Sequence, residues 1–256
     1  MNAAGASSLA KVTNDHRSLL NTGAAQARTL SEALVIDQPL LMRTVWPDAP
    51  DALHRAVTEA DPLGILQRMR HIGTALAAFA TPDQLGSFSR HPSDTVRGWV
   101  CFALAANDEA TPDTLLRALE PFADDEHFTV REWVWMAARP TFVEELEASI
   151  ALLARYTSHP SPRMRRFASE ALRPRGVWAS HIAALKREPD LGLPLLEPLR
   201  SDPEKYVQDS VSNWINDAAK TQPDWARELC ARWLTESPTP ATERIAKRGL
   251  RSLPQA

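Results

Sequence analysis

The stretch that decides the fold is residues 160–178, Pro-Ser-Pro-Arg-Met-Arg-Arg-Phe-Ala-Ser-Glu-Ala-Leu-Arg-Pro-Arg-Gly-Val-Trp. Its first part recurs along the chain as a turn followed by an apolar residue, a polar residue and further apolar or aromatic residues. The other copies are residues 92–104 (Pro-Ser-Asp-Thr-Val-Arg-Gly-Trp-Val-Cys-Phe-Ala-Leu), 127–139 (His-Phe-Thr-Val-Arg-Glu-Trp-Val-Trp-Met-Ala-Ala-Arg) and 203–215 (Pro-Glu-Lys-Tyr-Val-Gln-Asp-Ser-Val-Ser-Asn-Trp-Ile). The sequence is therefore that of a repeat protein.

The spacing of the copies indicates the kind of repeat. Their first apolar residues, with a fifth one near the C-terminus, are Val96, Val130, Met164, Val207 and Ile245, at intervals of 34, 34, 43 and 38 residues. Such periods are typical of helical solenoids, in which each helix pair buries its apolar face only against neighbouring pairs. We predict an all-α solenoid of HEAT-like (armadillo/HEAT-type) repeats.

Prolines mark the expected helix boundaries. Pairs such as His91-Pro, His159-Pro and Arg173-Pro lie between apolar-periodic segments, and proline disfavours a helical conformation for the residue before it. No segment has the alternation and hairpin turns of β-strands. Residues 1–27 lack strong apolar periodicity, so we predict a flexible lead-in there and a single HEAT-like repeat domain over 28–256.

Composition excludes several classes of protein. The 256 residues are 44% hydrophobic and 24% charged, which is ordinary for a soluble globular chain. There is no apolar run of about 18 residues and no secretory signal pattern, so we expect a cytoplasmic protein without a membrane partner, and a monomer. Cys101 and Cys230 lie far apart without the short Cys/His spacing of a zinc site, so no metal is expected.

Charge is divided unevenly along the chain. Residues 1–154 hold 12 Lys and Arg against 20 Asp and Glu, whereas residues 155–256 hold 17 against 12, although the net charge is only -3. The two parts therefore carry about -8 and +5, which favours an anionic partner on the C-terminal part. Solvated helix faces can also differ in charge by chance, so the excess alone does not decide the partner.

The third copy of the repeat concentrates arginines. Arg163, Arg165, Arg166, Arg173 and Arg175 lie within thirteen residues. The planar guanidinium group suits phosphate oxygens, and a basic concave face of a solenoid can follow a duplex backbone. Nucleic acid is thus the leading partner, with a protein scaffold that binds acidic segments as the alternative. The corresponding arginines of the earlier copies, Arg97 and Arg131, are interpreted mainly as ties between repeats.

Tryptophans near the repeat phrase are candidates for a binding surface. Trp135, Trp178 and Trp214 lie at or beside it, and exposed aromatic rings near phosphate-binding arginines can stack on bases or face a cationic base. Trp178 is the best candidate, because Arg-Pro-Arg-Gly should end the helix before it. Four other tryptophans are assigned to packing: Trp99, Trp133, Trp225 and Trp233.

At these residues the chain resembles the HEAT-like-repeat DNA alkylation repair glycosylases, the AlkC/AlkD superfamily, and is more similar to the AlkC branch. Residues 169–178 resemble that branch's Ser-Glu/Asp-Gly-Thr-Arg-Pro-Arg-Leu-Pro-Trp. Residues 202–220 are similar to its Asp-Pro-Ser-x-Tyr-Val-Arg-x-Ser-Val-Ala-Asn-x-Leu-Asn-Asp-x-x-Lys, and residues 65–73 match more loosely. The resemblance covers most of residues 30–253.

The resemblance implies an activity. It implies hydrolysis of the N-glycosidic bond of cationic alkylated purines, of the 3-methyladenine or 7-methylguanine class, in double-stranded DNA, with no cofactor. Such a reaction needs a carboxylate near the sugar, which develops oxocarbenium character, and an aromatic surface near the base. Glu170 and Trp178 fit these roles. An acidic position of AlkC relatives falls on Trp135, with Glu132 about one helical turn away.

The predicted site therefore has two parts. The catalytic residues are Glu170, Trp178 and Trp135, which we expect to line one site. The predicted DNA contacts are Arg131, Arg139, Arg163, Arg165, Arg166, Arg173, Arg175, Lys205, Asn213, Trp214 and Lys220. The alternatives are a non-catalytic HEAT-repeat protein that binds damaged or structured DNA and a protein-interaction scaffold.

Overall fold

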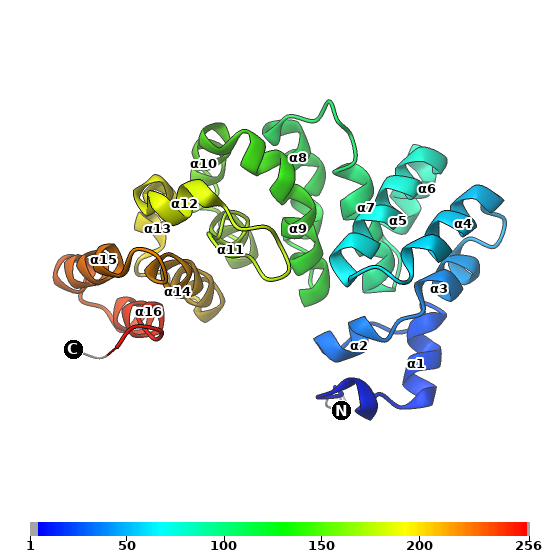
Figure 1. The fold of residues 1–256 in the computed structure, drawn as a ribbon, viewed down its shortest axis with the longest axis horizontal. Helices are drawn as coiled ribbons and strands as arrows, with labels where there is room; N and C mark the ends of the chain where they lie inside the picture. The colour runs from blue at the N-terminus through cyan, green and yellow to red at the C-terminus, as the bar shows by residue number, and fades with distance from the viewer. Residues whose placement is uncertain (1–4, 255–256) are drawn as a thin grey trace. The chain divides into compact units, whose positions relative to one another are not determined.

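The chain is all-helical, as predicted. A computed structural model describes residues 5–254, and this part contains sixteen α-helices, three short 3-10 helices and no strand (Figure 1). Several X-Pro pairs lie at helix starts as expected: Pro82, Pro112 and Pro162 each occupy the first turn of a helix, where the missing N–H is not needed. The pair Arg139-Pro140 is an exception, because it lies inside the helix Phe128–Glu144.

The chain divides into two compact units, where the sequence was predicted to form one domain. Unit 1 combines the described residues up to Ala110 with Asp125–Ala137, and unit 2 combines Thr111–Asp124 with the described residues from Ala138. The elements of unit 1 are η1 (Leu9–Lys11), α1 (Asn14–Asn21), α2 (Leu30–Leu34), α3 (Gln38–Val45), α4 (Asp51–Ala60), α5 (Ile65–Phe79), α6 (Pro82–Phe88), α7 (Asp94–Leu104) and the first part of α9 (Phe128–Glu144).

Unit 2 contains the later repeats. Its elements are α8 (Pro112–Ala123), the rest of α9, α10 (Leu146–Ala154), α11 (Pro162–Glu170), α12 (Ala183–Arg187), η2 (Pro189–Gly192), α13 (Leu193–Leu196), η3 (Glu197–Leu199), α14 (Lys205–Ala219), α15 (Pro223–Glu236) and α16 (Pro240–Gly249). Within this unit α14 packs against both α11 and α16. The third and fourth copies of the repeat phrase, on α11 and α14, are therefore neighbours in space.

The apolar anchors of the repeat lie in the core. All five predicted positions are completely buried: Val96, Val130, Met164, Val207 and Ile245. In unit 1 the α5–α7 contact is close enough that a Cβ on Gly73 would come within 2.3 Å of the Phe102 side chain. Glycine at this position allows the two helix backbones to approach, so the apolar stripe packs without a gap.

A common turn precedes the four helices that carry the repeat phrase. We call the first residue of this turn the turn residue. Its side chain accepts a hydrogen bond from the backbone N–H of the second residue after it, and the helix starts at the third residue after it. The turn residues are His91, Asp125, His159 and Asp202, and their bonds from Ser93, His127, Ser161 and Glu204 measure 3.0, 2.6, 3.1 and 2.9 Å. The histidines predicted to occupy turns therefore shape them through Nδ1.

The polar residue after each anchor closes the same turn. Arg97 donates through Nη1 to the carbonyl oxygens of His91 and Pro92, at 2.7 and 3.0 Å. The equivalent residues Arg131, Arg165 and Gln208 each bind the carbonyls of their own turn residue and the next residue. No backbone N–H of residues 5–254 donates to these turn carbonyls, so a side chain satisfies them.

Two of these arginines also bind the turn residue of the following repeat. Arg97 forms a two-bond fork with Asp125, from Nε at 2.9 Å and from Nη2 at 3.1 Å. Arg165 forms the same fork with Asp202, at 2.6 and 3.1 Å. The first pair lies inside unit 1 and the second inside unit 2. The predicted tie between repeats is thus present at Arg97, and Arg165 has the same role.

The N-terminal segment, predicted to be a flexible lead-in, contains helical structure, and its flexibility stays a prediction. Residues 1–4 lie outside the described part, but residues 5–27 include η1 and α1, and Leu20 of α1 is completely buried. The buried carboxylate of Glu32 holds this segment: it accepts bonds from the backbone N–H groups of Ala6 and Arg28 and from the side chains of Arg28 and His16. These polar ties do not produce the apolar periodicity used to predict helices.

No helix within residues 5–254 has both the length and the apolar character needed to cross a membrane.

We predict that the Arg165–Asp202 fork stabilises unit 2. Arg165→Met leaves the Asp202 carboxylate, whose side chain is 4% exposed, without its partner, so the free energy of unfolding should fall by about 3 kcal/mol. Arg117→Met is the control, because Arg117 and Asp113 form an exposed pair whose loss should cost at most about 0.5 kcal/mol. Urea unfolding measures both, and equal losses would contradict the assignment.

A second prediction concerns pH. Burial alone would raise the pKa of Glu32, but hydrogen bonds from Arg28, Ala6 and His16 lower it to about 2. A folded-state pKa below the ordinary 4.5 means that the stabilisation is complete above pH 4.5 and is lost as the pH falls toward 2. Wild-type stability should therefore drop by about 3 kcal/mol more than that of Glu32→Gln over this range.

Urea unfolding at pH 6, 4 and 3 tests this prediction. Glu59→Gln is the control, because Glu59 is exposed and forms no ion pair within the described residues. Its pH profile should follow the wild type. A Glu32→Gln profile as steep as that of the wild type would show that Glu32 is not the group responsible.

Candidate functional site

A buried ionic network lies at the C-terminal end of α11. The guanidinium group of Arg173 lies between two carboxylates: Nη1 donates to Glu170 Oε1 at 2.7 Å, and Nε and Nη2 donate to Asp217 Oδ2 at 3.0 and 2.8 Å. All three side chains are less than a tenth exposed. Asp217 belongs to α14, so this network joins the third copy of the repeat to the fourth.

The second oxygen of Glu170 is also occupied. Oε2 accepts a bond from the Ser210 hydroxyl at 2.7 Å, and Arg166 Nη2 lies 3.6 Å away. Ser169 donates to Ser210 at 2.8 Å and extends the network. Burial alone would raise the pKa of Glu170, but the charges of Arg166 and Arg173 and the bonds from Ser210 and Arg173 lower it. Glu170 is therefore an anion at neutral pH.

Arg139 of α9 binds the backbone of the connection that follows this network, residues 171–182, which we call the α11–α12 loop (Figure 1). Its guanidinium donates to the carbonyl oxygens of Ala171 at 2.9 Å, Arg173 at 2.6 Å and Ser180 at 3.1 and 3.3 Å. The Arg139 residue is only 4% exposed. Burial, reinforced by the charge of Arg173, lowers the pKa of Arg139 to about 10.

Other bonds hold the same loop. Trp214 Nε1 donates to the carbonyl of Leu172 at 3.1 Å, and Arg175 Nε donates to the carbonyl of Asp217 at 3.2 Å. Within the loop, the Ile182 N–H donates to the Pro174 carbonyl at 3.0 Å. Helices α9 and α14 therefore both contribute to the loop conformation, and the Trp214 ring itself lies in the core.

This loop presents two apolar side chains to solvent. Val177 and Trp178 are 52% and 43% exposed. Trp178 has φ +59°, which makes it the one residue other than glycine with positive φ in the range 5–254. Left-handed backbone costs a non-glycine residue about 1–2 kcal/mol and persists where the surroundings fix it. The loop thus holds an exposed indole on a strained backbone, five residues after Arg173 of the ionic network.

The predicted DNA contacts fall into two groups. Arg139, Arg165, Arg173 and Trp214 form the internal bonds described above, and their contact with DNA stays a prediction. The remaining predicted contacts of unit 2 are at least partly exposed: Arg163, Arg166, Arg175, Lys205, Asn213 and Lys220. The Arg166 side chain, at 12%, is nevertheless no more exposed than that of Arg165. Lys205 and Lys220 are the most exposed of these, and Lys220 lies 3.5 Å from Asp217.

Some residues of this second group also have partners inside the protein. Arg163 binds the carbonyl of Asp124 at 2.9 Å, and Arg166 stacks over the Tyr206 ring at 4.5 Å. Asn213 accepts a bond from Arg251 at 2.9 Å. These contacts orient the side chains while leaving part of each accessible to a ligand.

Trp135 and Arg131 belong to unit 1. The Trp135 indole is almost completely buried, and its Nε1 donates to Glu132 Oε2 at 2.8 Å. The sequence left open whether Glu132 reaches the same helix face as Trp135, and the bond shows that it does. Arg131 binds its own turn carbonyls. The role of Trp135 in catalysis stays a prediction.

Asp217 and Ser210 were missed by the sequence analysis as members of the site. Both lie within residues 202–220, the stretch that resembles the alkylation repair glycosylases. Their seven-residue spacing could have indicated them, because it places both on one face of α14. That face packs against α11 and brings them to Glu170 and Arg173. No group of three or more His, Cys, Asp or Glu side chains in the described chain is arranged to hold a metal ion.

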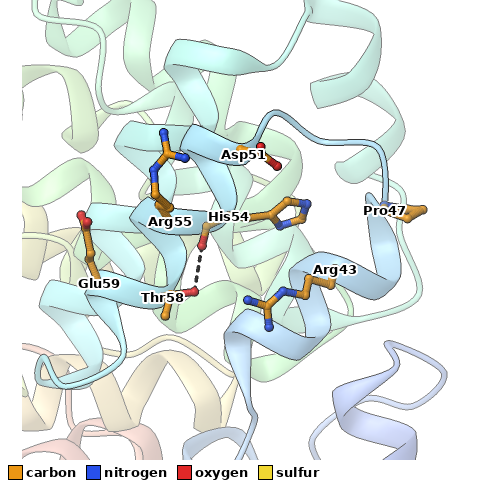
Figure 2. A pocket seen from close by; sticks show the side chains of 7 residues that line it. All are labelled: Arg43, Pro47, Asp51, His54, Arg55, Thr58 and Glu59. Carbon is orange, nitrogen blue, oxygen red and sulfur yellow. Dashed lines mark hydrogen bonds between the residues drawn. The ribbon is translucent and has the colours of Figure 1, made fainter.

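Unit 1 contains a surface groove of about 750 Å³ along α3 and α4 (Figure 2). Its lining includes two arginines, Arg43 and Arg55, and two carboxylates, Asp51 and Glu59, together with Pro47, His54 and Thr58. Opposite charges are present in equal number, so the groove has no clear preference for an anion or a cation.

Known structures share this fold. The chain is similar to the Pseudomonas fluorescens alkylpurine DNA glycosylase AlkC, solved bound to DNA containing an abasic site analog, with a TM-score of 0.65 and 22% identity over 97% of this chain and 65% of that one. It is also similar to smu.31 from Streptococcus mutans UA159, with a TM-score of 0.59 and 16% identity over 77% of this chain and 97% of that one. No protein-family model matches the chain.

These comparisons show that the chain has the all-α fold of AlkC, so the resemblance found in the sequence is confirmed at the level of the fold. In sequence it is a homologue of YhaZ, an uncharacterized protein of Bacillus subtilis strain 168, with 38% identity over 128 residues. That match covers 50% of this chain and 35% of YhaZ, so the chain matches about a third of that relative's length.

We predict that the ionic network is needed for folding whereas the exposed indole is not. Arg173→Met leaves two buried carboxylates, Glu170 and Asp217, without the charge between them, and should lower the free energy of unfolding by about 3–5 kcal/mol. Trp178→Ala removes an exposed side chain from a strained position and should cost less than about 1 kcal/mol. Urea unfolding separates the two, and a large loss in Trp178→Ala would show that its ring is part of the core.

Proposed function

We propose that this protein is a DNA glycosylase that removes cationic N-alkylated purines from double-stranded DNA. The observation that carries the proposal is the AlkC fold over 97% of the chain. It is supported by an exposed indole and an ionised carboxylate in one segment, at the residues where the sequence resemblance is strongest. The glycosylase activity belongs to AlkC. We extend it to this chain because of the fold and these residues.

The exposed basic residues of unit 2 would bind the duplex. Lys205 and Lys220 are exposed, and Arg163 and Arg175 are partly exposed. Cations of this kind neutralise backbone phosphates and release counterions, so binding should weaken steeply with salt. We propose that these residues line a basic concave face, and that Trp178 reaches the damaged nucleotide from the α11–α12 loop.

The reaction balances without a cofactor. The bond between C1′ of the sugar and the base nitrogen breaks, and its electron pair neutralises the cationic base, which leaves as a neutral purine. Water then bonds to C1′ and gives up a proton to solvent. Positive charge on the sugar in the transition state is stabilised by negative charge held nearby. A π-face such as that of Trp178 attracts the cationic base.

We assign Glu170 the role of this fixed negative charge. Its lowered pKa keeps it ionised at neutral pH, so it cannot serve as a proton donor. The residue is only 2% exposed, so an effect of its charge across a few ångströms fits the geometry better than direct contact with water. Arg166 and Arg173 offset part of its charge, so we expect a moderate loss of rate, about tenfold to a hundredfold, in Glu170→Gln.

A non-catalytic DNA binder is the second candidate. Two observations favour it: Glu170 is covered by its arginine and serine partners, and an acidic position of AlkC relatives is occupied by Trp135, whose indole binds Glu132. Such a protein would recognise cationic bases through Trp178 and release none.

The deciding experiment measures bases released from N-methylated duplex DNA by the purified protein. We expect release of 3-methyladenine or 7-methylguanine above the spontaneous rate, and a loss of at least about tenfold in Trp178→Ala, because a cation–π contact and the stacking surface are removed. Leu234→Ala is the control, since Leu234 is 40% exposed on α15, and it should release bases at the wild-type rate.

The other outcomes distinguish the candidates. Wild-type protein that binds methylated duplex but releases no base would establish the binder. Absence of duplex binding even at low salt would favour a protein scaffold. Lys220→Met should weaken duplex binding and reduce its salt dependence by about one phosphate contact, with little effect on the rate at saturating DNA.

A further inference from the structure

Arg139 joins the two ends of the α11–α12 loop. Its guanidinium binds carbonyls at the start of the loop, on Ala171 and Arg173, and a carbonyl near its end, on Ser180. These bonds use Nε and both terminal nitrogens, so the group is directed at the loop backbone and away from solvent. A phosphate contact would require an accessible guanidinium edge, and this residue is 4% exposed.

The loop between these ends needs such a support. Residues 171–182 contain no helix, and Val177 and Trp178 at their tip are 52% and 43% exposed. Holding a flexible segment in one conformation costs entropy for every ordered residue, and the left-handed backbone of Trp178 adds strain. Bonds that fix both ends of the loop offset these costs.

The bonding pattern requires arginine. The planar guanidinium presents five N–H donors in a fixed fork, and three carbonyls in different directions can be satisfied by one such group. A lysine ammonium at this position would retain the charge but would lack the span to reach the carbonyls of Ala171 and Ser180 together. A phosphate contact, by contrast, tolerates lysine as a point charge.

We propose that Arg139 is a positioning residue that holds the α11–α12 loop closed and thereby sets the orientation of Trp178 toward its ligand. The effect on loop order stands on the geometry alone. The effect on catalysis rests on the proposed glycosylase function. Arg139 was predicted as a DNA contact, and the proposal replaces that role with an indirect one.

The test uses Arg139→Lys and trypsin under native conditions. The loop contains one site that trypsin accepts, the bond between Arg175 and Gly176, because Arg173 is followed by proline. The substituted position precedes Pro140 and so adds no site. We expect cleavage after Arg175 to become at least about tenfold faster, since the loop opens locally more often. Cleavage at the wild-type rate in a folded variant would overturn the proposal.

Arg97→Lys is the matched control for general destabilisation. Arg97 is similarly buried and also forks onto carbonyls, but it belongs to unit 1. It should lower overall stability without selective cleavage at Arg175. If Arg139→Lys does not fold, Trp214→Phe removes a different anchor of the same loop, the bond to Leu172. It should accelerate the same cleavage while keeping the ring in the core, and no acceleration would overturn the proposal.

Base-release kinetics and the salt dependence of duplex binding distinguish a positioning role of Arg139 from a phosphate contact. In Arg139→Lys we expect kcat for base release to fall about tenfold, with KM and the salt dependence of duplex binding unchanged, because no phosphate contact is lost. A salt dependence reduced by about one contact in Arg139→Met would show that Arg139 binds phosphate and would overturn the proposal. If the wild type releases no base, the proposed function fails, and the trypsin and salt measurements still decide the role of Arg139.

Discussion

The repeats depend on one side chain that satisfies backbone carbonyls before a helix start, an arginine in three copies and Gln208 in the fourth. Each turn before a repeat helix leaves two carbonyls without backbone donors, and the residue after the apolar anchor binds both. In Arg97 and Arg165 the same group also binds the aspartate of the following repeat. A buried charge is tolerated there because nearly every N–H has an acceptor. One side chain thus fixes a turn and joins two repeats, and the apolar stripe is free to pack.

This constraint explains what the sequence could and could not predict. The all-α fold, the repeat period and the burial of anchors such as Val96 and Met164 follow from apolar spacing and proline positions, which depend on local chain geometry. The roles of the arginines do not. A guanidinium that binds carbonyls and one that binds phosphate occupy the same kind of sequence position, and only burial distinguishes Arg139 and Arg173 from exposed Lys205.

The segment of the candidate site stays a prediction, and the structure adds contacts that the sequence did not indicate. Residues 160–178 do contain the exposed indole and the ionised carboxylate. Asp217 was outside the predicted set, because its contact with Arg173 joins two residues that are 44 positions apart in sequence. The N-terminal helix α1 was missed for a related reason: polar bonds to Glu32 hold its segment, and such bonds leave no periodic apolar signal.

The protonation state of the network bears on which bases the site could release. A neutral base leaves poorly unless an acid protonates it, whereas an alkylated cationic base needs no proton. Glu170 lies between Arg166 and Arg173, whose charges outweigh the effect of burial and keep its carboxyl ionised. An acid catalyst would need a Glu170 pKa near neutrality. Raising the pKa that far would require removal of the Arg166 or Arg173 charge, and Arg173 also binds Asp217 of α14. If the site is catalytic, the interactions that hold α11 against α14 therefore favour substrates that already carry a positive charge.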